Sequence, residues 1–243
     1  MTSHLQIRLC HSLPDFHTCV ALQRAIWGEA DLEVEPYVTF VVAAQTGGQV
    51  IGAFDGTEMV GFTLSLVGLR DGAPYLHSHM TGVLPSHRGR GVGRLLKLFQ
   101  REEALGRNIR LIEWTFDPLE TRNAHFNFNR LGAFARKYIS NFYGVTTSPL
   151  HRGIPTDRLL AEWHLDSPRV QSAIRNEPLT TPDSALTIHV PNFSSDTPSA
   201  SIINLQSRIR ERFLFHFANN FAATSILSTP QGSDYQLVPW TSP

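Results

Sequence analysis

The sequence carries little charge of either sign, and this scarcity narrows the classes of partner. Charged residues make up 17% of the 243 residues, and 21 Lys and Arg balance 21 Asp and Glu, so the formal net charge is +0. A protein that binds nucleic acid by neutralising phosphates shows a basic excess. We therefore expect no nucleic-acid partner.

Cysteine is scarce as well, and long apolar runs are absent. Cys10 and Cys19 are too few for a disulfide framework and lack the spacing of a zinc site. No segment reaches the roughly 18 apolar residues of a membrane span, and the first residues do not resemble a signal peptide. Hydrophobic residues still make up 42%, which is too many for a disordered chain. We expect a cytoplasmic globular protein with a small-molecule substrate and no membrane partner.

Apolar spacing and turn residues predict alternating helices and strands in the first two thirds of the chain. Helical spacing over 13–27 ends at Gly28, and Asp55-Gly56 joins two apolar runs as a hairpin. The strands expected from these signals are 50–54, 59–67, 75–83, 109–116, 134–143 and 159–165. The further helices expected are 91–105, closed by Gly106, and 122–131, ended by Gly132.

The composition changes near residue 167. Residues 167–201 are rich in Pro, Ser, Thr and Asn, which is typical of a linker or a loosely packed excursion. A helical face follows, for which Asp196 or Ser199 is the expected cap. The elements predicted in this part are the helix 202–217 and a strand pair at 221–227 and 235–238.

The most informative segment joins the expected strand 75–83 to the expected helix 91–105. It reads HRGRGVGR over residues 87–94. Closely spaced glycines let backbone N–H groups approach an anion, and a helix N-terminus adds partial positive charge. Formal positive charge nearby comes from Arg88, Arg90, Arg94 and Lys97. The segment predicts a phosphate-bearing ligand, and an ordinary glycine-rich strand-to-helix turn is the alternative interpretation.

Spacing indicates which ligand this loop suits. A P-loop would place Lys directly after Gly93, where Arg94 stands, and a dinucleotide fingerprint would need glycine at position 94. The pattern that remains is Arg-x-x-Gly-x-Gly, formed by Arg88, Gly91 and Gly93. In this pattern the sequence resembles the GNAT superfamily of acyl-CoA-dependent N-acyltransferases.

The resemblance extends over residues 5–165. The family places an asparagine-bearing helix that ends in Leu-Gly after the next strand, and Asn123 and Leu131-Gly132 stand there in this sequence. Residues 114–118 and 155–158 resemble a little-characterised bacterial branch of the superfamily. The resemblance implies an α/β, GNAT-like fold, in which a mixed, mostly antiparallel twisted sheet is flanked by helices. We therefore predict an acyltransferase domain over 1–166 and a C-terminal strand–helix–strand extension over 167–243.

The resemblance also implies a co-substrate, acetyl-CoA or another acyl-CoA. In the family, loop amides hold the CoA pyrophosphate, the preceding strand pairs with the pantetheine arm, and the helix asparagine contacts cofactor or substrate. These roles carry over to Met80, Gly82, Val83, Arg88, Gly89, Arg90, Gly91, Val92, Gly93, Arg94 and Asn123. A cap for its own helix is the alternative role of Asn123.

One position departs from the family pattern. Many members carry a tyrosine four residues before the Leu-Gly glycine, which protonates the departing CoA sulfur, and here that position is Phe128. A thiol with a pKa of about 8.5 can leave as thiolate at neutral pH. Tyr138, Tyr143 and a water are the open alternatives for a proton donor. The departure also motivates an alternative function, a non-catalytic acyl-CoA-binding or interaction module.

The attacking amine needs a general base, for which His77 and Glu113 are the candidates. His77 lies six residues before Val83, where some relatives place a glutamate base, and period-two alternation puts it on one face with His79 and Thr81. Glu113 lies in an apolar strand, where burial would strengthen a carboxylate as a base. Buried core histidines and an exposed strand carboxylate are the structural alternatives.

Two other residues are weaker candidates, because Asp117 suits a turn and His125 a helix surface. His77 and His79 with Glu113 or His125 would also suit a metal. Two histidines at i and i+2 are frequent by chance in a chain with 11 histidines, so we expect no metal.

These observations predict an acyl-CoA-dependent N-acyltransferase. The primary amine of a small molecule, such as an amino acid, would attack the thioester directly in a ternary complex. A main-chain N–H near Met80 would stabilise the tetrahedral oxyanion. The helix of the extension is a candidate for covering the acceptor side or for a homodimer contact.

Overall fold

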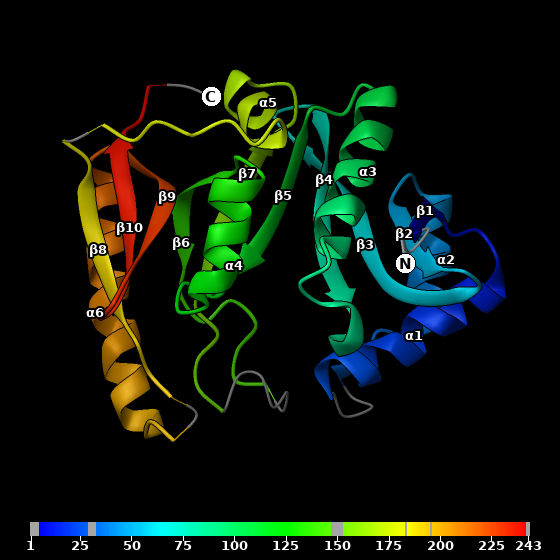
Figure 1. Cartoon of the computed structure of the whole chain (residues 1–243), viewed down its shortest axis with the longest axis horizontal. Coiled ribbons are helices and arrows are strands. Elements are labelled where there is room, and N and C mark those ends of the chain that lie inside the picture. The colour runs from blue at the N-terminus through cyan, green and yellow to red at the C-terminus, as the bar shows by residue number, and fades with distance from the viewer. Residues whose placement is uncertain (1–4, 29–32, 147–152, 183, 195, 242–243) are drawn as a thin grey trace. The chain divides into compact units, whose positions relative to one another are not determined.

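The computed structural model describes residues 5–28, 33–146, 153–182, 184–194 and 196–241 (Figure 1). The chain falls into two compact units, the first formed by residues up to Glu113 and the second by residues from Trp114 on. The predicted boundary at residue 167 stays a prediction, because a compact unit is not the same as a family domain.

The first unit contains a mixed sheet with the strand order β1-β2-β3-β4-β5. Its pairs are antiparallel except for β4 and β5, which run parallel. The strands are β1 (Leu5–Leu9), β2 (Gln49–Asp55), β3 (Glu58–Arg70), β4 (Ala73–Val83) and β5 (Leu111–Phe116), whose last residues belong to the second unit. The helices are α1 (Leu13–Trp27), α2 (Tyr37–Gln45) and α3 (Val92–Gly106).

Side chains of β2 alternate between two apolar cores. Val50 and Phe54 pack with buried residues of α1 and α2, whereas Ile51 and Ala53 pack with Val92 and other residues of α3. Because successive side chains of a strand point to opposite faces, α1 and α2 cover one face of the sheet and α3 covers the other. Both faces of β2 are therefore buried.

Local signals account for the ends of α1 and for the hairpin. The Ser12 hydroxyl accepts a hydrogen bond from the Asp15 N–H at the start of α1, and Gly28 ends the helix with φ +65°. Gly56 adopts φ +64° in the turn between β2 and β3. These predictions are confirmed, whereas α2 was not predicted, since its sequence YVTFVVAAQ has no polar face.

Both cysteines are buried in the first unit and are free thiols. The neighbouring Cys10 thiol, together with burial, raises the pKa of Cys19.

The second unit contains an antiparallel sheet with the order β7-β6-β9-β10-β8. Its strands are β6 (Phe134–Ile139), β7 (Arg158–His164), β8 (Leu186–Pro191), β9 (Phe221–Thr229) and β10 (Gly232–Pro239). Its helices are α4 (Thr121–His125), which continues as a π-helical turn over Phe126–Arg130, α5 (Pro168–Ile174) and α6 (Ser199–Ala218). The prediction of a mixed, mostly antiparallel sheet flanked by helices is confirmed.

The C-terminal region differs from the prediction in two respects. The segment predicted as a linker contains α5 and the edge strand β8. The cap predicted from Asp196 or Ser199 is wrong, because Pro198 precedes α6 and no side chain caps it. The predicted helix and strand pair are present as α6, β9 and β10. Within the described residues, none of the helices has the length and hydropathy of a membrane span.

Candidate functional site

A β-bulge interrupts β4. Ser78 pairs with Ser65 of β3 and Met80 pairs with Leu64, so His79 is the extra residue on β4. On its other edge β4 pairs in parallel with β5 at Leu76–Ile112 and His77–Glu113. Within the described residues this ladder has no further pairs, so β4 from Ser78 to Val83 presents an unpaired main-chain edge.

The predicted strand contacts lie on this edge. The Thr63 hydroxyl donates to the carbonyl of Met80 over 2.9 Å, which fixes the strand just after the bulge. At Gly82, a Cβ atom would lie 2.9 Å from the Ile26 side chain and 3.0 Å from the Trp27 side chain, so a larger residue there would displace side chains at the end of α1. The backbone of β4 is thus held in place by β3 and α1 while its other edge stays open.

The glycine loop follows β4 after a short 3₁₀ turn at Pro85–His87. Gly89 has φ +75° and Gly91 has φ +80°, a left-handed conformation that favours glycine. Gly91 directly precedes α3, and no side chain caps this helix. The first amides of α3, beginning at Val92, therefore have neither an intrahelical acceptor nor a side-chain cap, which is the arrangement of an anion site.

The basic side chains near the loop differ in their hydrogen-bond partners and in their burial. The Arg88 guanidinium donates to the carbonyls of Val83 and Ile26, each over 3.2 Å, and so ties the loop to β4 and α1. Lys97 is buried, and its ammonium donates to Ser78 over 3.1 Å and to Gln100. The prediction that Lys97 adds charge at the loop is therefore wrong. Burial lowers the pKa of Lys97 to about 7.

Lys97 belongs to a buried polar layer between α3 and the sheet. The Gln100 amide donates to Ser65 over 2.6 Å and to Ser78 over 3.3 Å, and Gln49 donates to the Gln100 carbonyl over 3.1 Å. Sequence reasoning missed this layer. The only local signal was a polar pair, Lys97 and Gln100, one turn apart on the apolar side of the helix.

The two histidines of β4 lie near each other, with ring centroids 6.4 Å apart. The bulge at His79 breaks the alternation, and the Thr81 hydroxyl lies 2.8 Å from that of Thr63. The predicted common face of His77, His79 and Thr81 is therefore wrong for Thr81. Burial lowers the pKa of His77, and the nearby His79 and Lys97 lower it further, so its ring is neutral at pH 7.

Glu35, which sequence reasoning missed, lies next to His79. Its carboxylate is 3.4 Å from the His79 Nε2 atom. Its main chain is held by the fully buried Gln23 of α1, which accepts from the Glu35 N–H over 2.8 Å and donates to the Glu35 carbonyl over 3.0 Å. No local sequence pattern joins these residues, because Glu35 is 12 positions from Gln23 and 44 positions from His79.

The structure buries Glu113, with 2% of its side chain exposed. Its carboxylate forms an ion pair with Arg70 at the end of β3, and the Arg70 guanidinium lies 5.4 Å from the Tyr75 ring centre. The ion pair holds the Glu113 carboxylate in place in β5.

The remaining predicted residues lie in the second unit. Asn123 is exposed on α4, and since Glu120 is the N-cap, the alternative of a capping Asn123 is wrong. Asp117 accepts from the Leu119 N–H over 2.8 Å in a turn, and burial raises the pKa of Asp117 to about 6. His125 is exposed.

The aromatic candidates of the second unit have structural partners. Phe128 is fully buried and contacts Phe116 and Tyr235 edge-on, at centroid distances of 5.6 and 6.1 Å. The Tyr138 hydroxyl donates to Asp157 over 2.6 Å, and the Tyr143 hydroxyl lies 3.0 Å from that of Thr115. In the described part of the chain, no three His, Cys, Asp or Glu side chains converge as a metal site.

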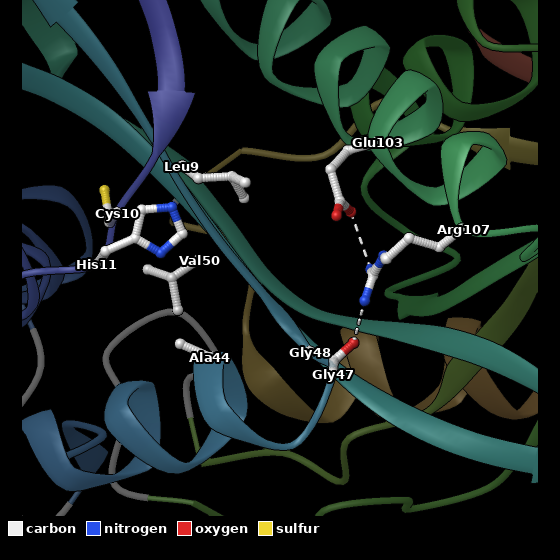
Figure 2. Close-up of a pocket in the computed structure, with 9 residues that line it drawn as sticks. All are labelled: Leu9, Cys10, His11, Ala44, Gly47, Gly48, Val50, Glu103 and Arg107. Carbon is white, nitrogen blue, oxygen red and sulfur yellow. Dashed lines mark hydrogen bonds and ion pairs between the residues drawn. The ribbon is translucent and has the colours of Figure 1, made fainter.

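A small pocket lies elsewhere in the first unit. Arg107 donates to the Gly47 carbonyl over 2.6 Å and to the Glu103 carboxylate over 2.8 Å. Figure 2 draws both bonds as dashed lines among the residues that line the pocket. Its lining residues are Leu9, Cys10, His11, Ala44, Gly47, Gly48, Val50, Glu103 and Arg107. Glu103 and Arg107 mark the C-terminal end of the 15-residue α3, roughly 20 Å from the loop at its start. The pocket is therefore separate from the glycine loop.

Comparison with known proteins agrees with this geometry. The family model described as Acetyltransferase (GNAT) family matches residues 9–133. No protein of curated function matches the chain.

Solved structures share the fold at low sequence identity. The ribosomal-protein-S18-alanine N-acetyltransferase from Escherichia coli is 13% identical, with a TM-score of 0.54 over 67% of this chain and 95% of that one. NAA60 of Arabidopsis thaliana, solved with acetyl-CoA, is 14% identical, with a TM-score of 0.54 over 66% of this chain and 99% of that one. The yncA protein of Salmonella typhimurium, solved with its cofactor acetyl-CoA, is 17% identical, with a TM-score of 0.52 over 67% and 95%.

Proposed function

Because this chain belongs to the acetyltransferase (GNAT) family, we propose that it transfers an acetyl group from acetyl-CoA to the primary amine of a small molecule such as an amino acid. The observation that carries the proposal is the junction of β4 and α3. There an unpaired strand edge leads into a left-handed glycine loop and an uncapped helix N-terminus.

The described residues fit CoA at this junction. Amides of residues 88–93 and the start of α3 would bind the diphosphate, with Arg90 and Arg94 adding positive charge. The main chain of Met80, Gly82 and Val83 would pair with the amides of the pantetheine arm. Cofactor contact by Asn123 of α4 stays a prediction from the resemblance.

The acceptor reacts as a free amine. Its nitrogen attacks the thioester carbonyl, the C–S bond breaks with its electron pair going to sulfur, and one proton leaves the nitrogen. We assign His77 as the base, since its lowered pKa keeps the ring neutral at pH 7. We assign the oxyanion contact to a main-chain N–H near Met80, beside the bulge. Glu113 supports this end of β4 through its pairing with His77.

The departing sulfur leaves as thiolate in this scheme, because Phe128 has no proton to give. The same residue favours a second candidate function, a non-catalytic acyl-CoA-binding module of the same fold. Both candidate functions predict that the protein binds CoA, but only the transferase predicts turnover of acetyl-CoA with an amine.

Calorimetry with acetyl-CoA, followed by thiol release with each of the twenty amino acids and a set of aliphatic amines, tests both. Binding with turnover supports the transferase, and binding without turnover supports the module. If calorimetry detects no binding of acetyl-CoA, both are rejected.

Gly91→Ala tests the loop. We expect CoA affinity to fall about tenfold or more, because a left-handed residue with a Cβ costs roughly 1–2 kcal/mol and shifts the amides. Gly56→Ala is the matched control, since Gly56 is also left-handed and, like Gly91, would place its Cβ in open space. Equal CoA affinity of the two variants would place the diphosphate elsewhere.

His77→Ala tests the base. We expect turnover to fall by about 10²–10⁴ while acetyl-CoA affinity is retained. Unchanged turnover would remove His77 from the mechanism and leave the binding site standing.

A further inference from the structure

Three elements of the first unit converge beside the β4 bulge. Gln23 of α1 holds the main chain of Glu35 from both sides, and the Glu35 carboxylate reaches the His79 ring at 3.4 Å. His79 in turn lies beside His77, with 6.4 Å between ring centroids. The result is a line of three titratable side chains that begins at the assigned base.

Burial opposes a proton on His77, and its neighbours in this line reach solvent. The side chains of His79 and Glu35 are 26% and 32% exposed. A proton taken up by His77 therefore meets unfavourable surroundings and has partly exposed acceptors next to it. Imidazole rings with centroids 6.4 Å apart are within the span of one bridging water.

Resting on the proposed function, we propose that His79 and Glu35 are a proton relay that carries the acceptor's proton from His77 to solvent. The proton lost by the amine nitrogen moves to His77, through water to His79, to the Glu35 carboxylate and then to bulk water. The N–C bond forms and the C–S bond breaks as above, so the relay ends with both imidazoles neutral and the carboxylate ionised. Gln23 is a positioning residue, because it fixes Glu35 through main-chain bonds.

The charges around the relay suit this direction. Lys97, on the α3 side, adds to the effects that oppose a proton on His77, whereas the side chain next to His79 is the Glu35 carboxylate, at 3.4 Å. Among the described residues, neither Arg nor Lys pairs with Glu35. Its carboxylate therefore remains available to accept a proton.

Glu35→Gln and His79→Gln test the relay with acetyl-CoA and the fastest acceptor from the amine screen. We expect kcat to fall about tenfold or more in both, with acetyl-CoA affinity unchanged. Added imidazole buffer restores kcat, because a small base replaces the missing carrier. Glu35→Asp retains most of the rate, since a carboxylate remains.

Glu58→Gln is the matched control, because it also removes one carboxylate, from the exposed first residue of β3. The relay is overturned if Glu35→Gln behaves like Glu58→Gln, or if imidazole fails to restore the lost rate, which would indicate a structural role. A wild-type protein that turns over no amine overturns the proposed function itself. Wild-type turnover with an unaffected Glu35→Gln overturns only the relay.

Discussion

Phe128 shows how a single residue can be understood differently from the sequence and from the structure. Its position identifies it as the place where many related enzymes carry tyrosine. The structure adds that the ring is fully buried between Phe116 and Tyr235. Because its neighbours on both sides are aromatic rings, the position suits a side chain without a hydroxyl.

Phe128→Tyr is expected to destabilise the protein without raising its turnover. A hydroxyl at this position enters an aromatic cluster, and an unsatisfied buried hydroxyl costs about 1–3 kcal/mol. Urea unfolding measures the loss. Phe142→Tyr is the control, because Phe142 is 43% exposed and its added hydroxyl reaches water. A Phe128→Tyr variant of unchanged stability and higher turnover would contradict this account.

Because Lys97 is buried, we expect the free energy of unfolding to depend on pH. Burial lowers the pKa of Lys97 from 10.5 to about 7 in the folded protein. Between these values the unfolded chain binds more protons than the folded chain, so the free energy of unfolding rises with pH over this range. The penalty for burying the charge is complete below pH 7 and is absent above pH 10.5.

Lys97→Met removes this penalty. We expect the stability of the variant relative to wild type to be greatest below pH 7 and to decline towards pH 10, by an amount of up to roughly 5 kcal/mol. Urea unfolding at a series of pH values gives the difference. Lys137→Met is the control, because Lys137 is exposed and is the other lysine of the chain. If the free energy of unfolding changed with pH in the same way for Lys97→Met and wild type, burial of the Lys97 ammonium would have no effect on stability.

Residues of the site differ in how far the sequence could predict them. The glycines at 89, 91 and 93 are a local pattern, and the left-handed conformations at the first two follow from it. His79 and Glu35 could not be paired in advance, because a bulge and a contact across 44 positions bring them together. The direction of the Lys97 side chain likewise depends on Ser78, which lies on another element.

Among the elements, those with strong local signals were predicted and those without were missed. α1 has Ser12 and Gly28 at its ends, and the β2–β3 hairpin has Asp55-Gly56 at its turn. α5 is short, and polar turn residues surround it, so composition alone indicated a linker. β8 is an edge strand whose partner, β10, follows about forty residues later, and such pairing is not a local property.

α6 is held to its unit by a buried carboxylate. Arg210 of α6 donates to Asp157 over 2.7 and 3.1 Å, and Asp157 is fully buried and also accepts from Tyr138. Removing one partner of a buried ion pair leaves an uncompensated charge. The ion pair is therefore expected to matter for the stability of the second unit.

Arg210→Met should cost about 2–3 kcal/mol. This is less than for a wholly buried pair, because the Arg210 side chain is 29% exposed and Asp157 keeps its bond from Tyr138. Arg208→Met, at an exposed position of the same helix, is the control. Chemical unfolding followed by fluorescence gives both values, and equal stability of the two variants would refute the anchoring role.

For the molecule as a whole, ligand binding offers a test of where CoA acts. A ligand that binds only the folded state stabilises it by about 2.7 kcal/mol at a hundred times its dissociation constant. We expect CoA to raise the thermal midpoint and pantetheine, which lacks the diphosphate, to raise it far less at equal concentration. Equal shifts with the two compounds would show that the loop amides contribute little to binding.

The two sequestered thiols give this protein a built-in reporter. Cys10 and Cys19 both belong to the first unit and are at most 1% exposed, so an alkylating reagent reaches them only when that unit opens. The mass gained from alkylation under native conditions would therefore report how often the first unit, which carries the glycine loop, opens. Slower labelling in the presence of CoA would link occupancy of the loop to the integrity of the core beneath it, with no engineered probe required.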